Sequence, residues 1–283
     1  MQTLQHRTHL RAALRTFRAA GETVALVPTM GALHDGHMAL VADARRRADR
    51  VVVSIFVNPR QFGPNEDFEA YPRPVSLDAA KLEAAGVDIL WLPEVREMYP
   101  EGFATNISVE GLPDRLCGAA RPGHFDGVTT VVAKLFNQVQ PDLAIFGEKD
   151  WQQLAIIRRM AADLDMALEV SGFPTQREED GLALSSRNAY LTPEERAAAI
   201  ALPRALGHAA RTIEAGGDIA PALAEIAPAL LKAGFAAVDY AELVDAGTLT
   251  PLDRLDRPAR LLAAARIGKA RLIDNIPVIP PAA

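Results

Sequence analysis

A nearly continuous apolar run, VVVSIFV at residues 51–57, is the feature that most restricts how this chain can fold. Strands of a parallel sheet are covered by helices on both faces, so their residues are apolar in succession and do not alternate with polar ones. Shorter runs of the same kind occur at residues 24–27, 87–92, 143–146 and 167–171. Since helical patterns lie between these runs, the sequence predicts a doubly wound α/β fold with a parallel sheet.

The helices of this first part are predicted from local start and stop signals. Ser76 is expected to cap a helix that ends near Gly86, because serine accepts from first-turn N–H groups and glycine suits helix ends. Residues 127–139 form a second predicted helix, which Pro141 stops because proline cannot continue the hydrogen-bond pattern. Residues 151–164 form a third.

The pattern changes after about Pro174. Thr192 and Glu195 are typical of a helix start, because a threonine cap and a glutamate three residues later satisfy each other's N–H groups. An Ala-rich helix is expected from there to about Ala215, and a second helix at residues 219–232. Strand-like segments follow at residues 238–244, 260–264 and 271–274. This part is therefore predicted to be a smaller α+β unit.

Composition narrows the class of protein. The chain has 283 residues, 49% of them hydrophobic and 23% charged, which is typical of a soluble globular protein. Its net charge of −6, without a long Lys/Arg block, argues against nucleic-acid binding, and no apolar stretch reaches membrane-spanning length. The single cysteine, Cys117, excludes an internal disulfide framework, so a cytoplasmic location is expected.

The segment PTMGALHDGH at residues 28–37 follows a predicted strand and precedes a helical pattern. In open α/β sheets ligands bind at such strand ends, and a helix N-terminus there favours phosphate. Gly31 and Gly36 allow a tight turn and a close approach to a ligand, while His34 and His37 add donors. The motif indicates a nucleotide triphosphate site, although two histidines at this spacing also fit a metal half-site or a solvated surface loop.

Two further polar segments follow predicted strands. NPRQF begins at Asn58 directly after one strand, and its Asn and Gln amides suit a hydroxylated carboxylate; a simple turn around Pro59 is the alternative. GEKDWQQ at residues 147–153 opens a helix, where Lys149 suits phosphate and Asp150 suits ribose hydroxyls. A charged helix start without a ligand is the alternative there.

Two loop-like segments complete the set. DGLALSSRN at residues 180–188 places two hydroxyls before an arginine, a pattern that favours polyphosphate binding, although a polar linker between domains has the same composition. RPGHF, which begins at Arg121 and contains His124, is either a mobile active-site segment or a turn.

The chain resembles the pantoate–β-alanine ligase family. The resemblance rests on PTMGALHDGH (28–37), VNPRQF (57–62), RPGHFDGV (121–128), FGEKDWQQ (146–153) and DGLALSSRNAYL (180–191). It implies a Rossmann-like nucleotidyl-transferase domain that binds ATP and pantoate at residues 1–175, and a smaller α+β lid domain at residues 176–283. The implied reaction joins pantoate to β-alanine through a pantoyl-adenylate, with Mg²⁺ on the ATP phosphates and no metal held by the protein. A homodimer is also implied.

The resemblance also implies roles for individual residues. The catalytic group, in which His37 donates a proton, is His34, His37, Lys149, Ser185, Ser186 and Arg187. The ATP-binding group adds to these Met30, Gly31, Gly36, Gly147, Glu148, Asp150, Gln176 and Leu184. Pantoate and β-alanine are expected at Gln61, Gln153, Asn58 and Met30.

Departures from the family pattern are small. Leu184 and Arg187 replace a methionine and a lysine of the related phosphate loop, and Arg60, Trp151 and Gln176 stand where Thr, Tyr and Val are common. None of these changes removes a group that the chemistry requires. Two other functions remain open: an adenylyltransferase acting on a phosphorylated acceptor, and an ATP sensor without turnover.

Overall fold

The computed structural model describes residues 1–64, 66 and 68–280 and divides into two compact units. The first unit comprises residues 1–148 and 156–174, and the second comprises residues 149–155 and 175–283. The segment 149–155, which lies before the predicted domain boundary, therefore clusters with the later part of the chain. None of the helices in the described residues combines the length and hydrophobicity that a membrane crossing requires.

The first unit is built on a six-stranded sheet in the order β1-β4-β3-β2-β5-β6, in which every neighbouring pair is parallel. The strands are β1 (Gln2–Leu4), β2 (Val24–Thr29), β3 (Arg50–Ile55), β4 (Ile89–Trp91), β5 (Leu143–Gly147) and β6 (Glu169–Phe173). The predicted α/β fold is thus confirmed. Strand β1 had no counterpart among the predicted strands, because its three residues are too few and too polar to form an apolar run.

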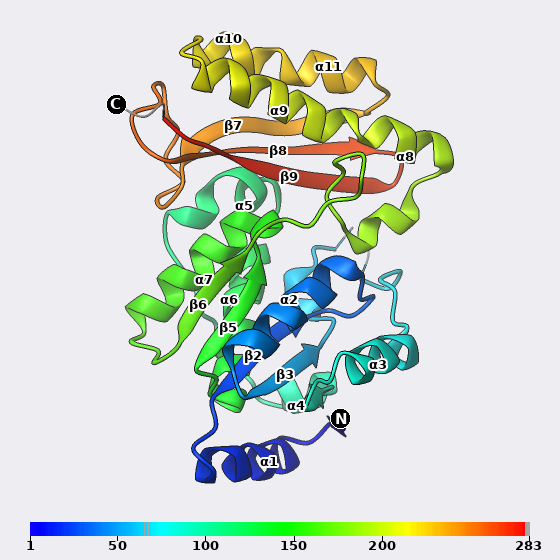
Figure 1. Ribbon diagram of the computed structural model, residues 1–283, viewed down its shortest axis with the longest axis vertical. Helices are drawn as coiled ribbons and strands as arrows, with labels where there is room; N and C mark the ends of the chain where they lie inside the picture. Colours follow the sequence, from blue (N-terminus) through cyan, green and yellow to red (C-terminus); the bar gives the residue numbers. More distant parts are fainter. Residues whose placement is uncertain (65, 67, 281–283) are drawn as a thin grey trace. The chain divides into compact units, whose positions relative to one another are not determined.

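Helices cover both faces of this sheet (Figure 1). The α-helices along this part of the chain are α1 (Arg7–Ala19), α2 (Asp35–Arg47), α3 (Val75–Ala84), α4 (Val95–Met98), α5 (Leu116–Ala120), α6 (His124–Val139) and α7 (Trp151–Asp163). Ala25 and Val27 of β2 pack with Leu40 and Val41 of α2 in one apolar cluster. On the other face, Trp91 of β4 donates to Gln138 of α6, as expected for strands buried on both sides.

The predicted helix cap at Ser76 is wrong. Helix α3 begins at Val75, with Pro74 in the capping position and no side-chain cap, so Ser76 lies within the first turn. A proline at the start is tolerated because its missing N–H has no intrahelical partner there. The proline, and not the serine after it, therefore marks where this helix begins.

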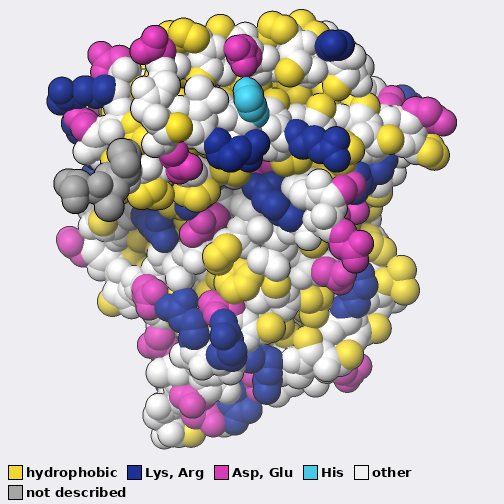
Figure 2. Space-filling model, turned by 45° about the horizontal axis from the view of Figure 1, so that its top comes forward, with side chains coloured by type: hydrophobic (Ala, Val, Ile, Leu, Met, Phe, Trp, Pro, Cys, Tyr) yellow, Lys and Arg dark blue, Asp and Glu magenta, His cyan; other side chains and the backbone are white. Residues whose placement is uncertain are grey.

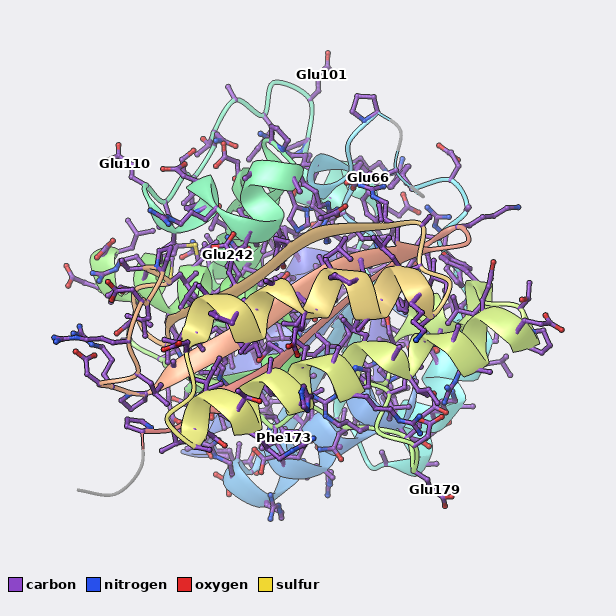
Figure 3. The ribbon with its side chains drawn as sticks, turned by 90° about the horizontal axis from the view of Figure 1, so that it is seen from above. Glu66, Glu101, Glu110, Phe173, Glu179 and Glu242 are labelled. Atoms are coloured by element: carbon purple, nitrogen blue, oxygen red, sulfur yellow. The ribbon has the colours of Figure 1, made fainter. Side chains whose placement is uncertain are left out.

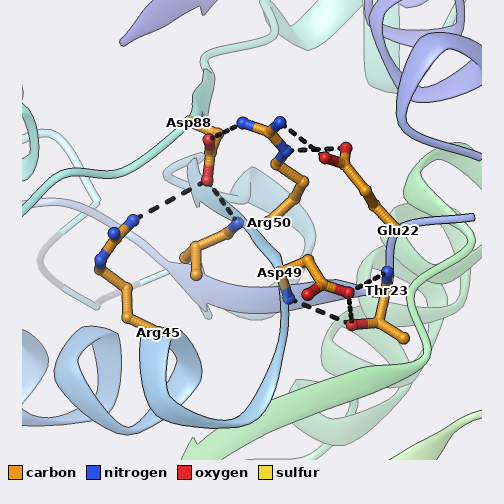
Figure 4. A network of polar contacts seen from close by, with 7 residues as sticks. Glu22, Thr23, Arg45, Asp49, Arg50 and Asp88 are labelled. Carbon is orange, nitrogen blue, oxygen red and sulfur yellow. Dashed lines mark hydrogen bonds and ion pairs between the residues drawn. The ribbon is translucent and has the colours of Figure 1, made fainter. Parts of the chain in front are cut away.

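An ion-pair network joins the amino ends of β2, β3 and β4 (Figure 4). Arg50 contacts Glu22 at 2.7 Å and Asp88 at 2.9 Å, and the second oxygen of Asp88 accepts from the Val51 N–H at 2.8 Å. Hydrogen bonds from Arg50 lower the pKa of Glu22. This edge of the sheet therefore carries interactions that align strands, whereas the motifs singled out from the sequence follow the opposite edge.

The second unit contains a three-stranded antiparallel sheet of β7 (Ala237–Asp245), β8 (Ala259–Ile267) and β9 (Ala270–Val278). One face packs against a helical layer in an apolar cluster that includes Leu206, Ile226 and Leu261. That layer comprises α8 (Pro193–Ala199), α9 (Ala201–Glu214), α10 (Ile219–Ala224) and α11 (Ile226–Lys232). Hydrophobic side chains lie among charged ones on its outer surface (Figure 2).

Two helices predicted as continuous are each divided in two. Breaks follow Ala199 and Ala224, whose carbonyls would accept from residues 203 and 228 in an unbroken helix. Both of those residues are prolines, which have no N–H to donate. The capping box is confirmed: Thr192 accepts from the Glu195 N–H at 3.2 Å, and Glu195 accepts from the Thr192 N–H at 2.9 Å.

Candidate functional site

The strand order of the first unit reverses between β2 and β5. From β2 the chain proceeds through β3 to β4 on one side, and from β5 to β6 on the other. Such a reversal leaves a crevice beyond the carboxyl ends of the two strands, where open α/β sheets bind ligands. Residues 30–37 follow β2, and Gly147 ends β5. The two motifs predicted to hold nucleotide therefore begin at the switch point of the sheet.

A buried carboxylate holds the loop after β2. Asp78 of α3 is 1% exposed and accepts from the N–H groups of Ala32 at 2.8 Å and Leu33 at 2.9 Å. Gly31 has φ +87°, and an added Cβ would lie 3.1 Å from Ile55 and 3.2 Å from Asp78. Glycine is required here because L side chains disfavour this conformation and the space is filled. Sequence reasoning missed Asp78, since nothing in its local sequence connects it to this loop.

His34 and His37 lie at the amino end of α2, with ring centroids 4.1 Å apart. The main-chain N–H of His34 donates to Nδ1 of His37 at 3.3 Å. In a neutral ring this contact makes Nδ1 the acceptor, so the proton is assigned to Nε2. Nε2 of His37 is consequently an N–H donor. The α2 N-terminus adds partial positive charge, and the combination suits a phosphate or carboxylate.

Asn58 caps the short helix η1 (Pro59–Gln61), which follows β3 and ends at Gln61. Asn58 is 1% exposed and donates to Gln61 Oε1 at 3.1 Å and to the Gly127 carbonyl at 3.0 Å. Gln61 Nε2 contacts Met30 Sδ at 2.9 Å. Asn58 therefore contacts Gln61, and Gln61 contacts Met30, so three residues expected at the pantoate site are linked by direct contacts. Because Asn58 is buried and engaged by the protein, it orients Gln61 and is not itself exposed to a ligand.

The RPGHF segment holds the main chain of Gln61. Both Arg121 Nη2, at 3.3 Å, and His124 Nδ1, at 2.8 Å, contact the Gln61 carbonyl. Arg121 also contacts Glu66 through Nε at 2.6 Å. Burial opposes ionisation of Glu66, but the hydrogen bonds and charge of Arg121 outweigh it and lower the pKa of Glu66. The sequence left the role of this segment open, and its contacts show that it supports Gln61.

Lys149 and Asp150 belong to the second unit, where their ionic groups lie 3.8 Å apart. The main-chain carbonyl of Lys149 accepts from the Asn275 side chain at 2.8 Å. Trp151 donates its indole N–H to the Ala246 carbonyl at 2.9 Å, and Arg260 stacks on its ring at 3.6 Å. The segment that carries Lys149 is thus fastened to the antiparallel sheet by groups that sequence reasoning did not identify.

An ion pair between Arg177 and the buried Asp274 supports these contacts. Asp274, which is 2% exposed, accepts from both terminal nitrogens of Arg177, at 2.8 and 2.9 Å. Arg260 Nη1 donates to Asn275 Oδ1 at 3.1 Å. Two parallel N–H···O bonds fix both position and orientation of a guanidinium. This part of β9 is therefore held rigidly beside the Lys149 carbonyl.

Residues 176–188 form a loop of the second unit that is held together by its own hydrogen bonds. The Gln176 carbonyl accepts from the Leu184 N–H at 2.9 Å, so these two residues expected near the nucleotide are neighbours. Ser185 Oγ accepts from the Arg187 N–H at 3.2 Å and caps the helix η4 (Ser186–Tyr190). Hydrogen bonds between nearby residues of the loop thus fix the backbone conformation of the segment that carries Ser186 and Arg187.

The expected residues are divided between the two units of the structure. The first unit contains Met30, Gly31, His34, Gly36, His37, Asn58, Gln61, Gly147 and Glu148. The second contains Lys149, Asp150, Gln153, Gln176, Leu184, Ser185, Ser186 and Arg187. Gln153 is half-buried on α7. An isolated glycine within a helical pattern often marks a close packing contact. Gly127 was therefore the one sequence signal for the packing of α6 against η1.

The chain is similar to known proteins along its whole length. Residues 2–277 match the family model described as pantoate-beta-alanine ligase. The chain is 62% identical over 280 residues to the pantothenate synthetase of Rhizorhabdus wittichii, covering 99% of each protein. The crystal structure of pantothenate synthetase from Thermus thermophilus is 52% identical, with a TM-score of 0.92, and the match covers 99% of this chain and 100% of that one.

A further solved relative contains ligands. Pantoate-beta-alanine ligase from Francisella tularensis was crystallised with beta-gamma ATP and beta-alanine. It is 33% identical to this chain, with a TM-score of 0.83, and the match covers 98% of this chain and 97% of that one.

Proposed function

Because the chain belongs to the pantoate–beta-alanine ligase family, we propose that the two groups of residues described above bind ATP, pantoate and β-alanine and catalyse their condensation. The enzyme is a ligase that forms an amide bond at the expense of ATP. The observation that carries this conclusion is the similarity over the whole chain, including a relative crystallised with beta-gamma ATP and beta-alanine.

The reaction has two steps because a carboxylate is a poor acylating agent. In the first, the pantoate carboxylate attacks the α-phosphorus of ATP and releases pyrophosphate. In the second, the β-alanine amine attacks the pantoyl carbon and AMP leaves, so the amide is formed and the phosphorus–oxygen bond of AMP is kept. The protein must stabilise the negative charge that develops on phosphate in both steps.

His37 is the donor from the first unit that fits this requirement. Its Nδ1 accepts from the His34 N–H, so its Nε2 carries the proton that a phosphate oxygen can accept. The start of α2 contributes partial positive charge in the same region. We assign to His34 and to the main chain of Met30 and Gly31 the supporting contacts with the nucleotide.

The second unit supplies the cationic groups. Lys149, Ser185, Ser186 and Arg187 are proposed to bind the phosphates. Gly147, which belongs to the first unit, and Asp150 are proposed to hold adenosine, with Gln176 near the nucleotide. Glu148, also of the first unit, and Leu184 are proposed to contact ATP. The side chain of Lys149 is 19% exposed, so its charge is only partly screened by water. Residues 176–283 are proposed to act as a lid that excludes water, which would otherwise hydrolyse the acyl-adenylate.

The neutral amides are proposed to bind pantoate. Gln61 offers an N–H donor, since its oxygen already accepts from Asn58. Gln153 is assigned the second contact with pantoate, and Gln61 is also placed near the β-alanine carboxylate. Neutral amides suit a hydroxy acid better than a phosphorylated acceptor, which would require further cations.

Mg²⁺ is proposed to enter with ATP. This ion keeps several waters and is bound largely by substrate phosphates, so no residue of the protein is assigned to hold it. When bound, Mg²⁺ neutralises charge on the phosphates. From the family resemblance we further propose a cytoplasmic homodimer.

The test is an AMP-release assay on the purified protein with ATP, pantoate and β-alanine, omitting each in turn. We expect AMP and the amide only when all three are present, and pantoate-dependent pyrophosphate release without β-alanine. A dinucleotide product would indicate an adenylyltransferase instead. ATP binding with no AMP formed from the complete mixture would indicate a sensor.

A further inference from the structure

Asn58 has a protein partner at all four hydrogen-bonding positions of its side chain. Its nitrogen donates to Gln61 Oε1 and to the Gly127 carbonyl, at 3.1 and 3.0 Å. Its oxygen accepts from the Arg60 N–H at 3.2 Å and from the Tyr99 hydroxyl at 2.9 Å. An amide has two donor hydrogens and two acceptor lone pairs, so Asn58 is saturated.

The saturated network fixes which way each group donates. Since the Asn58 oxygen faces Tyr99, the tyrosine hydroxyl is the donor. Since the Asn58 nitrogen faces Gln61, the glutamine oxygen is the acceptor, and its Nε2 is turned to Met30 Sδ. The order Tyr99–Asn58–Gln61 is thus a chain in which every donor points the same way. Bonds arranged in this manner polarise and strengthen one another.

The last member of the chain faces a weak acceptor. Gln61 Nε2 is 2.9 Å from Met30 Sδ, and a thioether accepts hydrogen bonds poorly. A carboxylate or hydroxyl oxygen of a substrate is a much better acceptor and would take that place. The Tyr99–Asn58–Gln61 hydrogen bonds therefore orient the Gln61 carboxamide with its N–H groups available as donors, as an anionic hydroxy acid requires.

The environment of Tyr99 keeps its ring in place and its hydroxyl protonated. Its ring packs on Phe103 at 5.1 Å and Phe56 at 6.1 Å, and Arg60 lies over it at 5.5 Å. Burial raises the pKa of Tyr99 to about 12. The hydroxyl therefore remains a donor throughout the pH range in which the enzyme can be assayed.

We propose that Tyr99 is a positioning residue for pantoate, whose hydroxyl acts through Asn58 to hold the Gln61 carboxamide with its N–H groups toward the substrate. This inference rests on the proposed role of Gln61 in binding pantoate. Tyr99 itself touches no substrate, so its effect must disappear when Gln61 is removed.

The first test is Tyr99→Phe, which keeps the ring and deletes the hydroxyl. One lost hydrogen bond in a buried chain is expected to raise the KM for pantoate about three- to tenfold. The KM for ATP should stay within about twofold, because the hydrogen-bond chain reaches only the side chain of Met30, whereas the nucleotide contact of Met30 is assigned to its main chain. Tyr240→Phe, the same change on β7 of the second unit, is the matched control and should alter neither constant.

The second test combines Tyr99→Phe with Gln61→Ala. If Tyr99 acts through Gln61, the tyrosine change should have no further effect on the KM for pantoate in the Gln61→Ala background, because residues in one hydrogen-bond network are non-additive. An equal rise in both backgrounds, or a lower melting temperature with no rise in the KM for pantoate, would overturn the inference.

The single variant Gln61→Ala tests the pantoate-binding role of Gln61 separately from the positioning role of Tyr99. A raised KM for pantoate in Gln61→Ala, without one in Tyr99→Phe, would reject only the positioning role of Tyr99. An unchanged KM for pantoate in Gln61→Ala would reject the assigned pantoate site and, with it, the basis for the role of Tyr99.

Discussion

The side-chain amide of Asn275 donates to the main-chain carbonyl of Lys149 at 2.8 Å, across 126 positions of sequence. Asn275 is 2% exposed, and its oxygen accepts from Arg260. A lysine proposed to bind phosphate is therefore positioned through its main chain by the last strand of the second unit. Charge that is fixed in position before the reaction stabilises a transition state best when its support is rigid. The hydrogen bonds of Asn275 therefore bear on the phosphate-binding role proposed for Lys149.

Asn275→Ala is expected to slow pantoyl-adenylate formation. The change leaves the Lys149 carbonyl, which lies in a part-buried position, without this donor and should reduce the free energy of unfolding by about 1–3 kcal/mol. Displacement of Lys149 should lower the rate of pantoate-dependent pyrophosphate–ATP exchange by about tenfold. Asn137→Ala, on the exposed face of α6, serves as the control for the same substitution. A loss of stability with an unchanged exchange rate would contradict the positioning of Lys149.

His37→Ala is expected to impair catalysis far more than folding. The ring is half-buried, and its Nδ1 bond to the His34 N–H is long at 3.3 Å. Removing a donor aimed at developing charge should lower kcat of the adenylation step by about 10²–10³-fold. His37→Gln, which retains a neutral N–H donor, should recover part of that rate. Thermal denaturation is the companion measurement: equal losses of stability and activity would assign His37 a structural role.

Much of the fold and of the local motifs could be predicted from the sequence. Apolar runs identified β2, β3, β4 and β5 because a parallel strand buried on both faces leaves a continuous local signal. The edge strand β6, whose residues are exposed or only partly buried, was predicted two residues too early, at residues 167–171. The placement of the motif at residues 28–37 at the end of a strand also followed from local pattern, although β2 extends two residues into the motif, to Thr29. These features depend on neighbours within a few residues, which a sequence displays directly.

The supporting groups could not be predicted, because their partners are distant in sequence. Asp78 contacts the Leu33 N–H from 45 positions away, and Tyr99 contacts Asn58 from 41. An aspartate within a helix has no local feature that separates such a clamp from a solvated side chain. By contrast, the helix breaks at Ala199 and Ala224 did have a local signal, since prolines four residues later lack the required N–H.

Gly127→Ala is expected to displace the turn that carries Gln61. An added Cβ would lie 2.2 Å from the Arg60 carbonyl oxygen and 2.7 Å from the Gln61 N–H nitrogen, both main-chain atoms. Overpacking of this kind costs about 1–3 kcal/mol of stability, and the shift should raise the KM for pantoate more than the KM for ATP. In Gly207→Ala, also within a helix, the added Cβ would meet only the flexible Arg211 side chain at 3.3 Å. That control should be neutral or stabilising, and identical behaviour of the two variants would refute the steric explanation.

The Glu66–Arg121 pair is expected to make stability depend on acid pH. Burial opposes the charge on Glu66, but Arg121 outweighs it and lowers its pKa from the ordinary 4.5. A carboxylate with a lowered folded-state pKa binds fewer protons when folded than when unfolded. The stabilising contribution of Glu66 is therefore fully present above the pKa of the unfolded state and is lost as the pH falls through the pKa of the folded state.

Glu66→Gln should consequently be less stable than the wild type at neutral pH, with a difference that shrinks below about pH 4.5. The measurement is urea denaturation at a series of pH values from neutral to acid. Glu101, at the tip of an exposed loop that points away from the protein (Figure 3), provides the control Glu101→Gln, which should follow the wild type throughout. Because Arg121 also contacts the Gln61 carbonyl, Glu66→Gln should weaken pantoate binding at neutral pH as well. A stability difference that stays constant or widens on acidification would show that the charge on Glu66 does not stabilise the fold.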